Sequence, residues 1–146
     1  MVVERPIIEA VSPGVWLVRC EWPHHLEPEM QGEILASVQG AAGSGPVGLV
    51  FVLHERICEI APTVRGFWRR VTSDPCLRLA ALAVVTGSWA AEVEAQGFGV
   101  TSRMAGVSLQ VATFTREMDG IAWAAQAVAV LATSPTPVPA LYRAIS

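Results

Sequence analysis

Two short apolar runs, each bounded by turn-forming residues, constrain the fold of this chain most strongly. Residues 47–53 read VGLVFVL and residues 79–85 read LAALAVV. Runs of this length with no polar side chain on either face are typical of strands that are covered on both sides, and such strands occur in parallel sheets. Each run precedes a helix-start signal, Pro62 for the first and Ser88 for the second. The two runs therefore predict central strands of a parallel sheet.

The segments before these runs predict a leading hairpin. Residues 7–11 and 15–22 favour strands, and Ser12-Pro13-Gly14 between them is a turn signal. The second strand alternates, which predicts one buried face and one wet face. The residues expected on its buried face are Trp16, Val18, Cys20 and Trp22.

Four helices and an outer strand complete the predicted order. The helices are expected after Pro28, after Pro62, over residues 89–96, and after the N-cap Thr115. Residues 107–114 alternate and predict the outer strand. The stretch 97–106 contains three glycines and fits neither pattern. This alternation of strands and helices predicts an α/β domain with right-handed crossovers.

The last helix is apolar on two sides, and a helix of this kind needs two coverings. We expect the sheet to cover one side, and the tail or a partner chain to cover the other. The tail contains TSPTPVP, which predicts an extended proline-rich segment over residues 133–146, outside a domain of residues 1–132. The stripe expected to face the core is Met118, Ile121, Ala122, Ala125, Val128, Ala129 and Ala132, and the second stripe is Trp123, Ala127 and Val130.

Four segments resemble the STAS / SpoIIAA-like family of anti-sigma-factor antagonists. They are GVWLVRCEW, GLVFVLHERICEIAPTVRGFWRRV, RLAALAVVTGSWAAEV and VSLQVATFTREMDGIAWAA, and together they cover roughly residues 12–130. The resemblance implies an N-terminal β-hairpin followed by three strand-helix units, in a mixed sheet with a parallel core and flanking helices. It also implies a bacterial regulatory or scaffolding protein in a signalling complex. The family carries a phosphorylated Asp-Ser pair after the buried strand, where this chain reads Glu59-Ile-Ala-Pro-Thr63, so Thr63 is the candidate replacement.

Composition and charge narrow the functional classes. Hydrophobic residues make up 52% and charged residues 16%, which excludes a disordered, highly charged chain. The longest apolar run is too short to span a membrane. The net charge is −3 and every basic residue is arginine, so nucleic acid is not favoured as a partner. Cys20, Cys58 and Cys76 fit neither a disulfide framework nor a CxxC metal pair, which predicts buried thiols in a reducing cytoplasm.

No set of residues predicts catalysis or a metal site. His24 and His25 lack a third ligand at helical spacing. The pair His54 and Cys58 is flanked by two glutamates, which would raise the pKa of the thiol. We therefore expect a non-enzymatic chain without metal or cofactor.

A second possibility is a small-ligand module or minor enzyme. The turn Thr86-Gly87-Ser88 follows a buried strand and opens a helix, and backbone N–H groups at such a turn can bind an anion or a nucleotide. His54 is the candidate side chain beside it.

The favoured prediction is an interaction with another protein. Trp and Arg are enriched at interface hot spots, and Trp89 and Trp123 are the tryptophans expected at a contact surface. An apolar patch with an arginine rim is predicted to bind the partner, most simply as a homodimer through the last helix. The expected partner-binding residues are Arg65, Arg69, Arg70, Trp123, Val130, Leu141, Tyr142 and Ile145.

Overall fold

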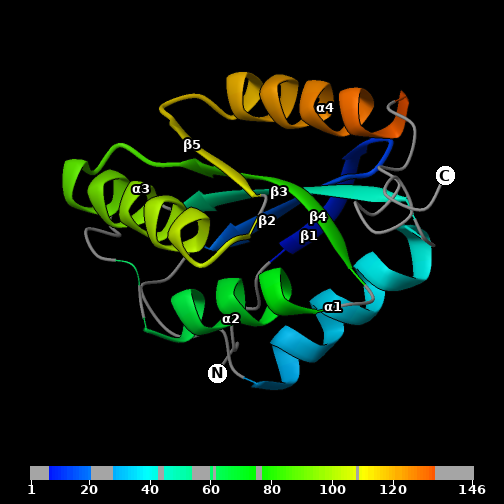
Figure 1. The fold of residues 1–146 in the computed structure, drawn as a ribbon, viewed down its shortest axis with the longest axis horizontal. Coiled ribbons are helices and arrows are strands. Elements are labelled where there is room, and N and C mark those ends of the chain that lie inside the picture. The colour runs from blue at the N-terminus through cyan, green and yellow to red at the C-terminus, as the bar shows by residue number, and fades with distance from the viewer. Residues whose placement is uncertain are drawn as a thin grey trace, which may run out of the picture.

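The computed structural model describes residues 7–20, 28–42, 45–53, 60, 62–74, 77–107 and 109–133, and the statements below concern this part of the chain (Figure 1). Five strands form one sheet in the spatial order β1-β2-β3-β4-β5. β1 is antiparallel to β2, and every other neighbouring pair is parallel. This confirms the predicted hairpin and the mixed sheet with a parallel core. The strands are β1 (Ile7–Ser12), β2 (Val15–Cys20), β3 (Pro46–Leu53), β4 (Arg78–Val85) and β5 (Gln110–Phe114).

Four helices cover the sheet unequally. Strands β2 to β5 follow one another in space, so right-handed crossovers place all three connecting helices on the same face. α4, which follows β5, is the one described helix over the other face (Figure 1). The helices are α1 (Pro28–Ala42), α2 (Pro62–Ser73), α3 (Trp89–Met104) and α4 (Glu117–Thr133). None of them combines the length and the hydropathy that a bilayer span requires.

The larger core lies between the sheet and the three connecting helices. Trp68 on α2 is almost completely buried, and its ring lies edge-on to Phe51 at 5.6 Å and tilted against Phe98 at 5.4 Å between centroids. These rings join the middle of the sheet to α2 and α3. The predicted core stripe of α2 is confirmed, with Val64, Phe67, Trp68 and Val71 buried.

The second core, under α4, depends on small residues. A Cβ atom added at Gly48 would lie 3.1 Å from Val128 Cγ2 and 3.4 Å from Ala124 Cβ, and one added at Gly120 would lie 3.1 Å from Val85 Cγ2. The helix therefore approaches the sheet through its smallest side chains. This corrects part of the predicted orientation. Val128 is buried as expected, and Ile121 and Ala125 are half-buried against the same core. Gly120 and Ala124 are also buried, whereas Met118, Ala122, Ala129 and Ala132 are exposed.

Because α4 covers the second face, both faces of β2 are buried over most of its length. Val18 and Cys20 are buried on the three-helix side, which confirms their predicted burial, and Trp16 is half-buried on the same side. Leu17, expected on a wet face, is completely buried on the α4 side. Trp22 lies outside the described residues.

Two helix boundaries also differ from the prediction. α3 does not end near residue 96 but continues to Met104, where Gly106 with φ +85° follows the last turn. Position 99 of this helix is a glycine because a larger side chain there would collide with Val111 of β5. α4 begins at Glu117, two residues after the predicted cap Thr115.

Candidate interaction surface

Exposed apolar side chains concentrate on α3. Six large apolar residues are exposed in the described part of the chain, and four of them lie on this helix. They are Trp89 (78% exposed), Val93 (47%), Val100 (47%) and Met104 (84%). We call these four residues the α3 stripe. Single apolar residues are common on protein surfaces, whereas large contiguous apolar patches are typical of interaction sites.

The spacing of the stripe places it on one side of the helix. Steps of four, seven and four residues at about 100° per residue keep the four side chains within one narrow sector. The opposite side holds the buried residues of α3, among them Ala91, Ala95 and Gly99. A Cβ added at Gly99 would lie 2.9 Å from Val111 Cβ, so this side is pressed onto β5. The stripe therefore faces away from the domain.

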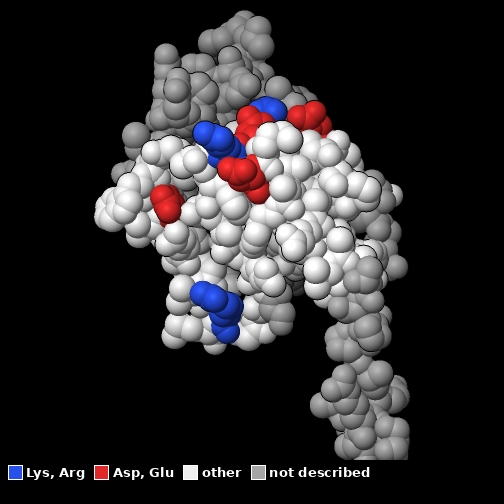
Figure 2. Space-filling model, turned by 90° about the horizontal axis from the view of Figure 1, so that it is seen from above, with Lys and Arg blue, Asp and Glu red and all other residues white. Residues whose placement is uncertain are grey.

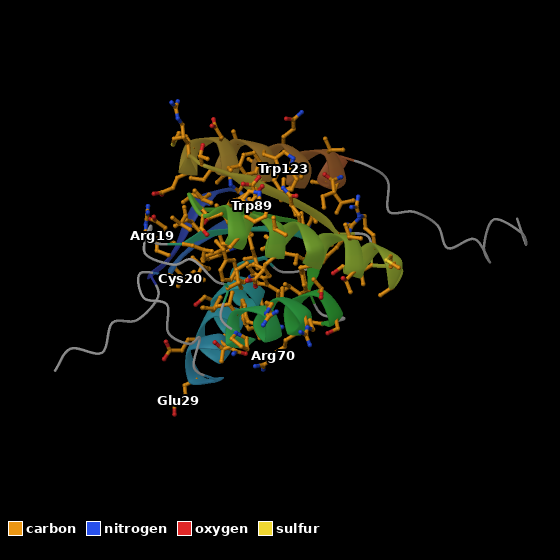
Figure 3. The ribbon with its side chains drawn as sticks, turned by 90° about the vertical axis from the view of Figure 1, so that its left-hand side faces the viewer. Arg19, Cys20, Glu29, Arg70, Trp89 and Trp123 are labelled. Atoms are coloured by element: carbon orange, nitrogen blue, oxygen red, sulfur yellow. The ribbon has the colours of Figure 1, made fainter. Side chains whose placement is uncertain are left out.

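Hydrogen bonds at its amino end fix the start of α3. Ser88, the predicted N-cap, has extended backbone angles, and its Oγ accepts from Ala91 N at 3.3 Å. Trp89, the first residue after this cap, lies near the carboxyl ends of the strands (Figure 3). The sequence singled out Trp89 as a surface tryptophan, and the structure confirms its exposure.

Polar residues flank the stripe on the side of β5. Gln96 Nε2 donates to Glu92 Oε1 at 3.3 Å and to Thr113 Oγ1 of β5 at 3.2 Å. Arg103 lies on the same flank, near the carboxyl end of the helix, and is exposed. On the other flank Glu94 Oε2 lies 3.9 Å from Arg65 Nη1 of α2. The stripe itself carries no charge, and its rim carries both signs.

The outer face of α4 forms a second apolar surface. Charged side chains gather near the amino end of this helix, and most of the remaining face is uncharged (Figure 2). Met118 and Val130 are exposed. Trp123, expected on the outer side, instead packs against Phe114 of β5 with ring centroids 5.6 Å apart. A shallow hollow of about 280 Å³ lies beside it, lined by Gln110, Trp123, Gln126, Ala127 and Val130.

The predicted partner-binding residues do not meet on one surface. Arg65, Arg69 and Arg70 lie on α2, and Trp123 and Val130 lie on α4 across the sheet. Arg69 and Arg70 are exposed, whereas Arg65 is half-buried beside α3. The tail residues Leu141, Tyr142 and Ile145 fall outside the described residues.

The turn proposed for an anion is occupied by its own hydrogen bonds. Thr86 is buried, its Oγ1 accepts from Ser88 N at 3.0 Å, and its backbone N–H donates to Phe114 O at 2.9 Å. Gly87 is exposed and takes no part in these bonds. His54, the side chain expected beside the turn, lies outside the described residues.

An ion pair joins the end of β2 to the start of α4. Arg19 Nη2 lies 2.7 Å from Glu117 Oε1 and 3.6 Å from Glu9 Oε1 of β1, and Arg19 Nη1 donates to Glu117 Oε2 at 2.7 Å. The hydrogen bond to Glu117 is the main cause that raises the pKa of Arg19 above its ordinary value. Figure 3 shows Arg19 toward the other edge of the sheet from Trp89. This bidentate contact ties α4 to the hairpin.

The one described cysteine is not prepared for nucleophilic chemistry. Cys20 is buried at the end of β2, and burial raises the pKa of its thiol from 9.0 to about 12. A thiol that stays protonated is a poor nucleophile and a poor metal ligand. The described residues contain no group of three or more His, Cys, Asp or Glu side chains arranged to hold a metal ion. Cys58, Cys76, His24 and His25 lie outside these residues.

The larger groove of about 440 Å³ lies by the hairpin turn and the carboxyl end of α4. Ser12 supplies its only side-chain hydroxyl, and no lining residue is titratable. The lining therefore offers mainly shape and apolar contact, with no charged group. The lining residues are Ala10, Ser12, Pro13, Gly14, Trp16, Gly45, Pro46, Val128 and Ala132.

Comparison of the chain with models of known protein families, with curated proteins and with solved structures found no match.

Proposed function

We propose that this chain is a non-enzymatic protein-protein interaction domain with a regulatory or scaffolding role. The observation that carries the proposal is the α3 stripe, in which four large apolar side chains lie together in water. Complete burial of a fully exposed side chain of this size contributes about 1.5–3 kcal/mol, and Val93 and Val100, which are already half-buried, contribute less. A partner that covers the stripe therefore gains a substantial driving force, and the mixed charges of the rim supply orientation.

Two groups of side chains, one at the start of α3 and one at the end of β2, argue against nucleophilic chemistry. The hydroxyls of Thr86 and Ser88 are used by the turn and the helix cap. Cys20 is buried, with a thiol pKa of about 12. These groups support a binding role rather than nucleophilic chemistry.

The STAS / SpoIIAA-like resemblance belongs to this proposal, with the bacterial signalling role that it implies. It is supported by the order of elements, a hairpin followed by strand-helix units. Thr63 lies in the first turn of α2 and is half-buried. A phosphate there would sit near the positive end of the helix dipole, which favours a modified threonine at this place.

Site-specific photo-crosslinking in cells that express the full chain tests the interaction function. A photoreactive phenylalanine derivative replaces Val93 in the stripe, and the same group replaces Ala36 on the exposed side of α1 as the matched control. We expect light-dependent adducts with a polypeptide from position 93 and none from position 36. If position 93 yields no more adduct than position 36, the proposed function is wrong.

A further inference from the structure

We infer that the α3 stripe binds a second copy of the same chain, with the two α3 helices antiparallel across a two-fold axis. This inference rests on the proposed function and names the partner. α3 is the outermost helix on the β5 side of the three-helix face, with no other described helix beyond it, so a second α3 can lie against it (Figure 1). Two-fold dimers use one surface twice, so the surface must complement itself.

The spacing of the stripe meets that requirement. The positions 89, 93, 100 and 104 are symmetric about the point between residues 96 and 97. In an antiparallel pair centred there, Trp89 lies opposite Met104 of the second copy, and Val93 lies opposite Val100 of the second copy. Large side chains then meet at both ends of the contact, and small ones meet near its middle.

A glycine near the centre allows a close approach. Gly97 is exposed, and a Cβ added to it would have no atom within 4 Å. On the flank of Gly97 the two backbones can therefore come close, while the bulky Trp89 and Met104 pairs fill the wider space at each end. Small residues at a helix crossing are a common way to achieve this contact.

The charges at the rim are also complementary under the same symmetry. In an antiparallel two-fold pair, each flank of one α3 helix lies beside the same flank of the other. The flank that carries Glu92 and Arg103 therefore lies beside the corresponding flank of the second copy. Glu92 then lies within one helical turn of Arg103 of the second copy, and the pair occurs twice. In a parallel pair, equal residues lie at equal heights, and neither the Glu92–Arg103 contact nor the Val93–Val100 contact forms. The charges thus select the antiparallel arrangement.

The stripe is less suited to a lipid surface. Helices that lie on membranes carry several basic residues along their polar face. Arg103 is the only basic residue of α3, and Glu92 and Glu94 are also on this helix. A 16-residue helix is about 24 Å long, so the contact is small and the dimer should be weak and concentration-dependent.

Sedimentation of the purified full chain tests the dimer. From about 1 µM to about 200 µM the mass should rise from 15.6 kDa toward twice that value. Val93→Glu should raise the dimer Kd roughly a hundredfold, because the substitution places a charge opposite Val100 of the second copy on both sides of the axis. Val130→Glu, which changes an exposed valine of α4, should leave the dimer Kd unchanged. Circular dichroism at low concentration checks that both variants fold.

A charge exchange tests the arrangement. Glu92→Arg alone and Arg103→Glu alone should each weaken the dimer several-fold, and the double variant should restore the original Kd. A chain that stays monomeric, a dimer that is broken by Val130→Glu instead of Val93→Glu, or a double variant without restoration would each overturn the inference. A monomer whose position 93 still crosslinks to a different protein would overturn self-association alone and leave the proposed function standing.

Discussion

Two glycine-to-alanine substitutions should have opposite effects on stability, although both glycines lie inside helices. Gly66 is exposed on α2, and a Cβ added there would meet nothing within 4 Å. Gly99 is buried on α3, and its added Cβ would lie 2.9 Å from Val111 Cβ and 3.2 Å from Val111 Cγ2. We expect Gly66→Ala to stabilise the domain and Gly99→Ala to destabilise it.

The magnitudes follow from two competing terms. Alanine is favoured over glycine in a helix interior by about 1 kcal/mol, and this term applies to both sites. At Gly66 nothing opposes it, so the free energy of unfolding should rise by about 0.5–1 kcal/mol. At Gly99 the Cβ of Val111 is fixed to the β5 backbone and cannot turn away. Overpacking there costs about 1–3 kcal/mol, which leaves a net loss of up to about 2 kcal/mol.

Urea unfolding followed by circular dichroism measures both changes. The protein concentration should be a few micromolar, where the monomer dominates, and equal m-values would show that the denatured states are comparable. The corresponding shifts in Tm should be about 3–5 °C per kcal/mol for a domain of this size. If Gly99→Ala instead gains the about 0.5–1 kcal/mol expected for Gly66→Ala, the close approach of α3 to β5 is wrong.

Three further changes test the core, the ion pair and the buried thiol. Trp68→Phe should cost about 1 kcal/mol or less in urea unfolding, because the buried Nε1 has no hydrogen-bond partner, whereas Trp68→Ala should cost about 3–5 kcal/mol. A double-mutant cycle with Arg19→Met and Glu117→Gln should give a coupling of about 0.5–1 kcal/mol, since both side chains are about one-third exposed; zero coupling would contradict the contact. The pKa of Cys20 is higher in the folded chain (about 12) than its ordinary 9.0, so the stability gained from the neutral thiol is complete below pH 9 and is lost as the pH rises toward 12. The difference in stability between the natural chain and Cys20→Ala should therefore shrink over that range, and a constant difference would contradict the burial of the thiol.

The strands could be predicted because their signal is local. The run VGLVFVL has no polar residue, and it forms β3 in the middle of the sheet, as expected. The alternation over residues 107–114 likewise predicts an outer strand, and β5 is one, although it begins only at Gln110. Ser88 was predicted as a cap from its place between a strand and a helix, and the hydrogen bond to Ala91 confirms it.

The length of α3 could not be predicted, because a glycine has two opposite meanings in a sequence. Glycines such as Gly97 and Gly99 are typical of a helix end. Position 99 is nevertheless inside the helix, and it is a glycine because β5 leaves no room for a larger side chain. This reason becomes visible only with the tertiary contact. Because the predicted helix ended near residue 96, the sequence did not indicate Val100 and Met104, which form half of the α3 stripe.

The orientation of α4 could not be predicted from the sequence either. From Gly120 onward the helix has no charged residue, so its apolar pattern does not tell which side faces the sheet. The closest approach to Gly48 and Val85 selects the side with the smallest residues. The sequence also does not show that the arginines of α2 and the apolar residues of α4 lie apart, since only the strand order places these two helices on opposite faces.

Because α4 covers its face of the sheet and comes last in the sequence, it affects how the chain folds during synthesis on the ribosome. The residues that α4 covers, Leu17 and Val50 among them, are synthesised long before residues 117–133. Until α4 leaves the exit tunnel, this face of the nascent sheet is not covered by the helix and remains exposed to water and to neighbouring chains. Folding of this domain is therefore completed only after its strands have been translated. A stall before residue 117 would leave an aggregation-prone intermediate with one face of the sheet exposed.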